Sequence, residues 1–182
     1  MNDRLDDFFP QRRRSSARLP CNRTDGEFTC RHCHNTVTFN ALWSGTHNRN
    51  HCPYCLWSRH LDLERPGDRL AACRGAMRPI GLTLKRVRRR YAGPQAGELM
   101  LVHHCEECER ISINRIAADD LAYALEEVYT ASLRLPDALR ACLAAQSIAL
   151  LGEAERGLVQ ARLYGNAGIN IIQTVYIANE IG

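Results

Sequence analysis

The sequence has no run of about 18 or more apolar residues, which predicts that it forms no membrane-spanning helix. Its opening stretch, MNDRLDDFFPQRRRSS, lacks the apolar core of a signal peptide, so we expect no export. Cysteine, in contrast, is abundant, with nine residues in the chain. Thiols must stay reduced to bind metal, and we therefore expect a cytoplasmic protein whose cysteines hold metal instead of forming disulfides.

Lysine is almost absent, because Lys85 is the single lysine among 24 basic residues. Residues 1–115 hold 20 basic and 12 acidic residues, a net charge of +8, whereas residues 116–182 hold 4 and 8, a net charge of −4. Arginine binds phosphate through two hydrogen bonds and stacks on bases, so the basic half suits nucleic acid. A GC-rich coding sequence would also favour arginine, and composition alone leaves both interpretations open.

Six of the nine cysteines form three Cys-x-x-Cys pairs, and this spacing is typical of zinc knuckles. The first two pairs are Cys30/Cys33 and Cys52/Cys55, with 18 residues between Cys33 and Cys52. This gap falls within the usual range for a four-cysteine zinc site. The sequence therefore predicts that these four thiolates share one structural zinc ion.

A second zinc site is predicted from the remaining cysteines, because Cys73 joins the third pair, Cys105/Cys108, to make three thiolates. Histidine would complete a Cys₃His site. We favour His60, which lies 13 residues before Cys73 and can reach across from the first site. The other candidates for the fourth ligand are His51, His103 and His104. A different combination of the three pairs, or a redox or merely buried Cys73, also remains open.

The pattern of the chain predicts an α+β fold, with small zinc-ribbon-like β modules followed by a helical extension. We expect a flexible basic tail over residues 1–25, a zinc-binding domain over 26–118 and helices over 119–182. Within the domain, residues 36–39 and a hairpin of 80–91 with 98–103 have the composition of strands, and residues 43–48 resemble a turn. Helices are expected from residue 119, over 136–151 and over 153–163. Residues 169–177 fit either a strand or a helix, and their spacing favours a helix.

Residues Arg49 to Pro53 spell RNHCP, and the segment Arg49 to Asp62 reads RNHCPYCLWSRHLD. Together with the cysteine pairs, Gly67-Asp68-Arg69, Met77 to Ile80 and Asn114 to Asp120, this resembles the bacterial RNHCP domain family. The resemblance covers residues 28–120, about half of the chain, and implies a zinc-binding domain without implying an activity. One departure is Glu109, which stands where zinc knuckles often carry glycine after the second cysteine.

The first functional hypothesis is a nucleic-acid-binding protein, with RNA or a ribonucleoprotein favoured over DNA. Trp43, Tyr54 and Trp57 lie beside the knuckles and offer stacking surfaces. The candidate phosphate contacts are basic residues of the zinc-bearing half, namely Arg49, Lys85, Arg86, Arg88, Arg89 and Arg90. A solvated strand edge is the plainer interpretation of Arg88 to Arg90.

Two further hypotheses compete with nucleic-acid binding. The apolar segment 136–151 suggests an interaction scaffold that docks a protein partner through its C-terminal helices. A group of polar residues is similar to His-Asn-His nuclease sites, namely His47, Asn48, Asn50, His51, His60 and Asp62. A four-cysteine zinc site has no open coordination position for substrate, so the sequence favours a non-catalytic protein and predicts no catalytic residue.

Overall fold

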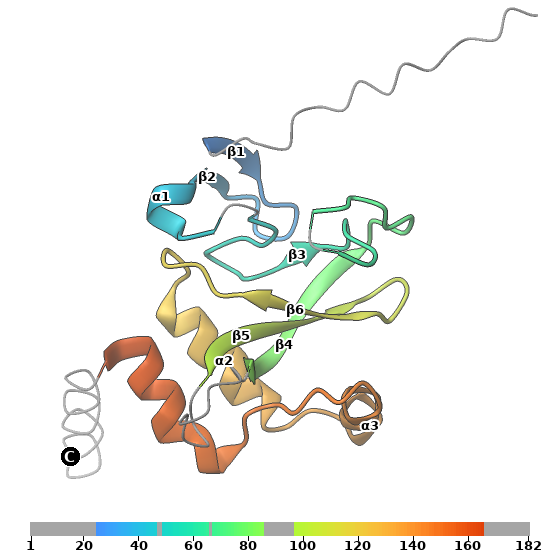
Figure 1. Ribbon diagram of the computed structural model, residues 1–182, viewed down its shortest axis with the longest axis vertical. Coiled ribbons are helices and arrows are strands. Elements are labelled where there is room, and N and C mark those ends of the chain that lie inside the picture. The colour runs from blue at the N-terminus through green and yellow to red at the C-terminus, as the bar shows by residue number, and fades with distance from the viewer. Residues whose placement is uncertain (1–24, 47–48, 66, 86–96, 166–182) are drawn as a thin grey trace, which may run out of the picture.

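The computed structural model describes residues 25–46, 49–65, 67–85 and 97–165 (Figure 1). The predicted basic tail, Cys21, the arginine-rich end of the predicted hairpin and the predicted helix over 169–177 lie outside these residues. The described part is a mixed α+β structure with antiparallel sheets, two Cys/His clusters and C-terminal helices, which confirms the predicted fold class. None of its helices is long and apolar enough to cross a membrane.

The first module is a small two-stranded sheet followed by one helical turn. Strand β1 (Asp25–Thr29) pairs antiparallel with β2 (Thr36–Asn40), and the first cysteine pair lies in the turn between them. The short helix α1 (Ala41–Ser44) begins where the Asn40 side chain accepts a hydrogen bond from Leu42 N, and it ends at Gly45. The turn predicted over 43–48 is therefore wrong for its first two residues, because Asn40 caps a helix there.

The second module is a four-stranded antiparallel sheet in the order β3-β4-β5-β6. Its strands are β3 (Ser58–Arg59), β4 (Ala76–Lys85), β5 (Glu98–Cys105) and β6 (Ile111–Arg115). The predicted hairpin corresponds to β4 and β5, which pair from Met77 with Cys105 to Lys85 with Glu98. A bulge between Pro79 and Gly81 shifts the register, so the strands curl rather than lie flat.

Helices cover both faces of this sheet. Leu101 and Val102 are successive residues of β5 and so point to opposite faces, and they belong to different core clusters. Leu101 packs with Leu125 and Tyr129 of α2 (Ala122–Ser132). Val102 packs with Leu143 of α3 (Asp137–Ala145) on the other face. In Figure 1 the β1–β2 module with α1 lies above the sheet, and α3 lies below it.

The chain after α3 covers an edge of β4 instead of continuing the predicted helix. The helix expected to reach residue 151 ends near Gln146, and Ser147 has a positive φ of 57°. Leu151 N then donates to Leu82 O at 2.9 Å, and the Thr83 hydroxyl donates to Ala149 O at 2.6 Å. The prediction was wrong because an open strand edge offers backbone hydrogen bonds that a longer helix would leave unmade.

After this segment, a single 3₁₀ turn η1 (Glu153–Glu155) leads into helical residues 156–165. The predicted third helix is thus present, although its first residues are 3₁₀. Val159 joins the core cluster of Leu101 and Leu125, and so does Leu56, the residue after the second cysteine pair. The metal-binding part and the helical part therefore share one core, although the predicted boundary at residue 118 stays a prediction.

Candidate metal centres

Three turns of the chain have the same backbone geometry. In each Cys-x-x-Cys pair the residue after the second cysteine has a left-handed φ near 60° and donates its N–H to the carbonyl of the first cysteine. These residues are His34 (φ 61°, N···O 3.0 Å), Leu56 (61°, 2.9 Å) and Glu109 (60°, 3.0 Å). This turn directs both thiols of a pair toward the same side, as a shared tetrahedral ion requires. The presence of Glu109 in place of the usual glycine therefore leaves the turn unchanged.

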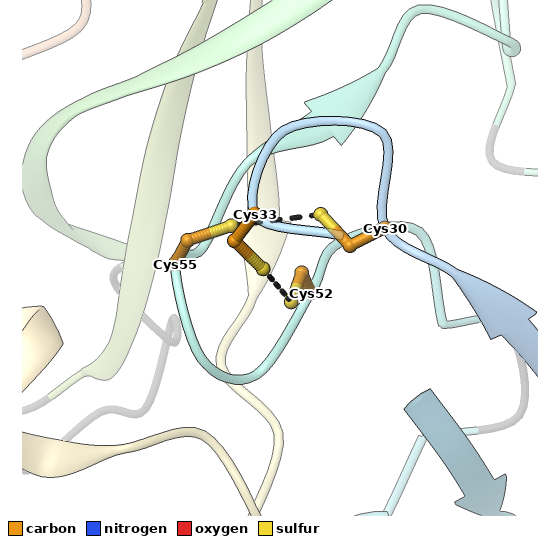
Figure 2. Close-up of side chains that lie close together, drawn as sticks. All are labelled: Cys30, Cys33, Cys52 and Cys55. Atoms are coloured by element: carbon orange, nitrogen blue, oxygen red, sulfur yellow. Dashed lines mark hydrogen bonds between the residues drawn. The ribbon is translucent and has the colours of Figure 1, made fainter. Parts of the chain in front are cut away.

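The first metal centre consists of Cys30, Cys33, Cys52 and Cys55, whose sulfurs all lie within 4.8 Å of one another. Figure 2 shows the two pairs facing each other, with Cys30 Sγ 3.6 Å from Cys55 Sγ and Cys33 Sγ 3.7 Å from Cys52 Sγ. A tetrahedral zinc ion with Zn–S bonds of about 2.3 Å needs sulfurs about 3.8 Å apart. The cluster thus has the size of a zinc site, and its thiols are too far apart to be disulfides.

The second metal centre consists of His60, Cys73, Cys105 and Cys108, and their donor atoms also lie within 4.8 Å of one another. Cys73 Sγ is 3.8 Å from Cys105 Sγ and 3.6 Å from Cys108 Sγ. The Nδ1 atom of His60 is 3.0 Å from Cys73 Sγ and 3.2 Å from Cys108 Sγ. Of the four candidate histidines, the structure brings His60 to this cluster, and the donor set is the Cys₃His type that suits zinc.

The thiols of the first centre have unequal acidities without a cation. Burial raises the pKa of Cys52 to about 11, and burial also raises the pKa of Cys55. Burial opposes ionisation of Cys33 too, but hydrogen bonds from the Asn35 backbone and from neighbouring thiols lower its pKa to about 7. A bound cation would favour all four thiolates at once, so metal binding releases protons and strengthens as pH rises.

The residues Arg49 and His51 of the RNHCP segment lie beside the first centre without belonging to it. The buried guanidinium of Arg49 pairs with Asp119 and Asp120. His51 Nε2 lies 2.7 Å from a carboxylate oxygen of Asp120, which also accepts a hydrogen bond from Ala117 N at 2.8 Å. These contacts join the loop before the second cysteine pair to the loop before α2.

A second chain of hydrogen bonds extends from Asn50 into the sheet. Asn50 donates to Asn114 of β6 at 2.7 Å, and Asn114 donates to His103 Nδ1 at 2.8 Å. His103 is fully buried, and its Nε2 donates to Leu56 O at 2.7 Å. Burial and the nearby His51 lower the pKa of His103 to about 3, so this imidazole stays neutral. The network therefore fixes the first centre against the sheet.

The residues of the proposed hydrolase cluster have other roles or lie outside the description. His60 is a ligand candidate, His51 bonds Asp120, and His47 and Asn48 lie outside the described residues. The Asp62 carboxylate accepts hydrogen bonds from Gly67 N at 2.7 Å and Arg69 N at 3.2 Å, and it thereby shapes the loop between His60 and Cys73.

The residues predicted to contact phosphate differ in their exposure to solvent. The prediction that Arg49 contacts phosphate is corrected, because its guanidinium is buried and paired with Asp119 and Asp120. Lys85 is exposed at the end of β4, whereas Arg86, Arg88, Arg89 and Arg90 lie outside the described residues. Sequence reasoning missed the structural role of Asp120, although the resemblance had included the segment Asn114 to Asp120.

Comparison with known proteins identifies the family of the chain. The family model of the RNHCP domain matches residues 25–126, from β1 into α2, and spans both centres. No curated protein and no solved structure matches the chain. The match covers more than half of the sequence and includes every candidate ligand. The chain belongs to the RNHCP domain family.

Proposed function

We propose that this protein holds two structural zinc ions and uses its zinc-bearing part to bind nucleic acid, with RNA preferred over DNA. The observation that carries the proposal is a set of arginines around the metal centres. Within the described residues, these side chains have no carboxylate at ion-pair distance: Arg31, Arg59, Arg65, Arg74, Arg78 and Arg110. A guanidinium group without a carboxylate partner can donate its hydrogen bonds to a phosphate.

Zinc is the metal that fits both centres. Thiolates and imidazole favour zinc among the common cellular cations, and four protein donors leave no position for substrate. Both centres therefore support a structural role, in which the metal holds short loops that have little core of their own. The loop ends held in this way carry Arg31 and Arg74, each next to a ligand. Metal binding would thus fix the position of the basic side chains.

The shape of the zinc-bearing part favours RNA. Reading duplex DNA directly requires a helix or a two-stranded ribbon in the major groove. In residues 25–115, the structure describes one helix, α1, and one two-stranded ribbon, β1–β2, and none of these elements carries a basic side chain. Loops and strand edges suit the unstacked bases of RNA loops and ends. A ribonucleoprotein would present the same chemistry.

The test is a titration of the zinc-loaded protein with structured RNA, single-stranded RNA and duplex DNA at several salt concentrations. Arginine–phosphate contacts release counterions, so affinity should fall steeply as salt rises. Replacing Arg86, Arg88, Arg89 and Arg90 with glutamine should reduce the slope of log affinity against log salt concentration. The expected reduction is up to about 0.7–0.9 for each lost phosphate contact. The matched control is Arg134→Gln, an exposed arginine between α2 and α3. Absence of binding, or binding indifferent to salt, would reject the proposal.

The interaction scaffold gains little support from α3. This helix buries Leu143 against the sheet, and most of its exposed side chains are alanines. Such a surface offers little apolar area to a partner. Failure of all nucleic acids to bind would nevertheless make docking through residues 136–151 the next hypothesis.

A further inference from the structure

We infer that the cleft between the two metal centres binds an unpaired nucleotide of an RNA strand, with its base on the His32–Trp57 stack and its phosphates on the surrounding arginines. The inference rests on the proposed function, because it names the place and the form in which nucleic acid binds. It goes further in predicting that a base must leave any duplex to occupy the site.

The cleft has a volume of about 820 Å³, which lies within the range of small-molecule sites and accommodates a nucleotide. Its walls come from both modules. Cys30 and His32 of the first cysteine pair line one part, and Cys73 and Gly75 of the second centre line another. Because the walls include ligands of both predicted zinc ions, the two metal centres would set the width of the cleft.

Two aromatic rings in the cleft are already stacked. The rings of His32 and Trp57 lie 4.1 Å apart between centroids, with only 8° between their planes. His32 sits between Cys30 and Cys33, and Trp57 follows Cys55 by two residues, so the first metal centre would hold both rings in place. Trp57 is half-buried, His32 is exposed, and both residues line the cleft.

An exposed aromatic side chain in a cleft offers a nucleobase a surface for stacking. Stacking of a base on an aromatic side chain is largely indifferent to the identity of the base, because every base has a π face. A base within a duplex has both faces covered by its neighbours, so only an unpaired base can extend the stack. The geometry therefore points to a single-stranded segment, a loop or a strand end.

Positive charge surrounds the stack. Arg31, Arg59 and Arg74 line the cleft, and among the described residues none of them has a carboxylate at ion-pair distance. Arg59 donates one hydrogen bond to Arg74 O at 3.0 Å, which orients its guanidinium without neutralising it. Glu106 and Glu107 also line the cleft and offer acceptors to ribose hydroxyl or base amino groups. Base, ribose and phosphate thus each meet a suitable group.

The chain contains two tryptophans, which allows a direct test by fluorescence. Trp43 is 82 % exposed on α1 and does not line the cleft. In a Trp43→Phe variant, Trp57 is the single reporter, and an unstructured RNA oligonucleotide should quench it saturably. In the matched Trp57→Phe variant, the remaining Trp43 should report no quenching.

The second part of the test compares the affinities of variants for the RNA oligonucleotide. Loss of one stacked base costs about tenfold in affinity, so Trp57→Ala and His32→Ala should weaken binding of the oligonucleotide by about that factor. Arg31→Gln combined with Arg74→Gln should also reduce the salt slope by about 0.7 per lost contact, whereas Arg134→Gln should change neither the affinity nor the salt slope. The zinc content of each variant should equal that of the wild type.

Three results would overturn the inference and leave the proposed function standing. The first is RNA binding without quenching of Trp57, and the second is an equal loss of affinity in the cleft variants and in their control. The third is duplex RNA that binds as tightly as the single strand. A free mononucleotide that binds as tightly as the strand would overturn the strand assignment. If no nucleic acid binds under any salt condition, the proposed function fails as well.

Discussion

The imidazole of His51 and the carboxylate of Asp120 are hydrogen-bonded at 2.7 Å although they lie 69 positions apart in the chain. Both side chains are buried, and Arg49 pairs with the same carboxylate. Two backbone bonds run alongside, from Ala118 N to Ser44 O and from Leu121 N to Pro53 O. Arg49 and His51 of the signature therefore hold the loop before the second cysteine pair against the segment before α2.

We predict that Asp120→Asn destabilises the protein without removing metal. The substitution leaves the buried Arg49 charge without full compensation, and breaking a buried ion pair in this way costs about 3–5 kcal/mol. Urea unfolding of the metal-loaded protein measures the change. Glu153→Gln, which breaks an exposed pair with Arg156, is the control and should cost at most about 1 kcal/mol. Equal effects of the two substitutions would contradict this role of Asp120.

The purified protein should carry two zinc ions, and Cys52→Ser should remove one of them. Cys52 is 1 % exposed and belongs to the first centre, where loss of a thiolate removes folding free energy together with metal affinity. Elemental analysis gives the stoichiometry, and circular dichroism follows the loss of structure. During titration with a chelator, the second centre should empty first, because Cys73 and Cys108 are exposed. A metal-free protein that keeps its full structure would argue against both centres.

We expect His60→Ala to loosen the second metal ion and to spare the first. His60 Nδ1 is the nitrogen donor among three sulfurs, so its removal leaves an incomplete coordination shell. Cobalt substitution distinguishes the centres, since Cys₃His and Cys₄ sites absorb differently. His60→Cys supplies a fourth thiolate and should retain the ion. Retention of normal affinity by His60→Ala would mean that another group completes the site.

Gly75→Ala should weaken the second centre selectively. A Cβ at this position would lie 2.9 Å from Cys105 Sγ and 2.8 Å from Glu107 Cβ, both closer than real contacts allow. Gly75 O also accepts the hydrogen bond of His60 N at 2.9 Å, so a shift of Gly75 would displace a ligand. Gly157→Ala is the control, because its added Cβ meets nothing within 4 Å. Competition with a metal indicator should show a lower affinity at one site in Gly75→Ala alone.

The stability of the protein should depend on His103 below pH 6.5. Burial lowers the pKa of His103 from 6.5 to about 3, so between these values the unfolded chain binds a proton that the folded protein does not. Stability is thus full above pH 6.5 and falls by about 1.4 kcal/mol per pH unit below it, for this one group. His103→Gln should reduce this slope by the amount that corresponds to about one proton, because the variant has no imidazole at this position. Unfolding at several pH values and one fixed free zinc concentration compares the two proteins, and equal slopes would contradict the assignment.

Much of the metal chemistry could be predicted from local sequence. The Cys-x-x-Cys turn forms from hydrogen bonds between residues at most five positions apart, such as His34 N to Cys30 O and Cys30 N to Asn35 O. The strands β4 and β5 were also predictable, because their apolar composition identifies them and their pairing is that of neighbours in sequence. The helix predicted over 136–151 failed because its last residues pair with β4, a partner about 66 residues away.

The sequence by itself determined which residues can hold metal, because the spacing of each cysteine pair dictates its turn whatever lies around it. Only the tertiary structure decided that His60 and not His51 meets Cys73, that Arg49 is buried against Asp119 and Asp120, and that a cleft lined by Arg31 and Arg74 separates the two centres. These outcomes depend on contacts between distant segments, and such contacts form only where the free energy of the whole fold favours them.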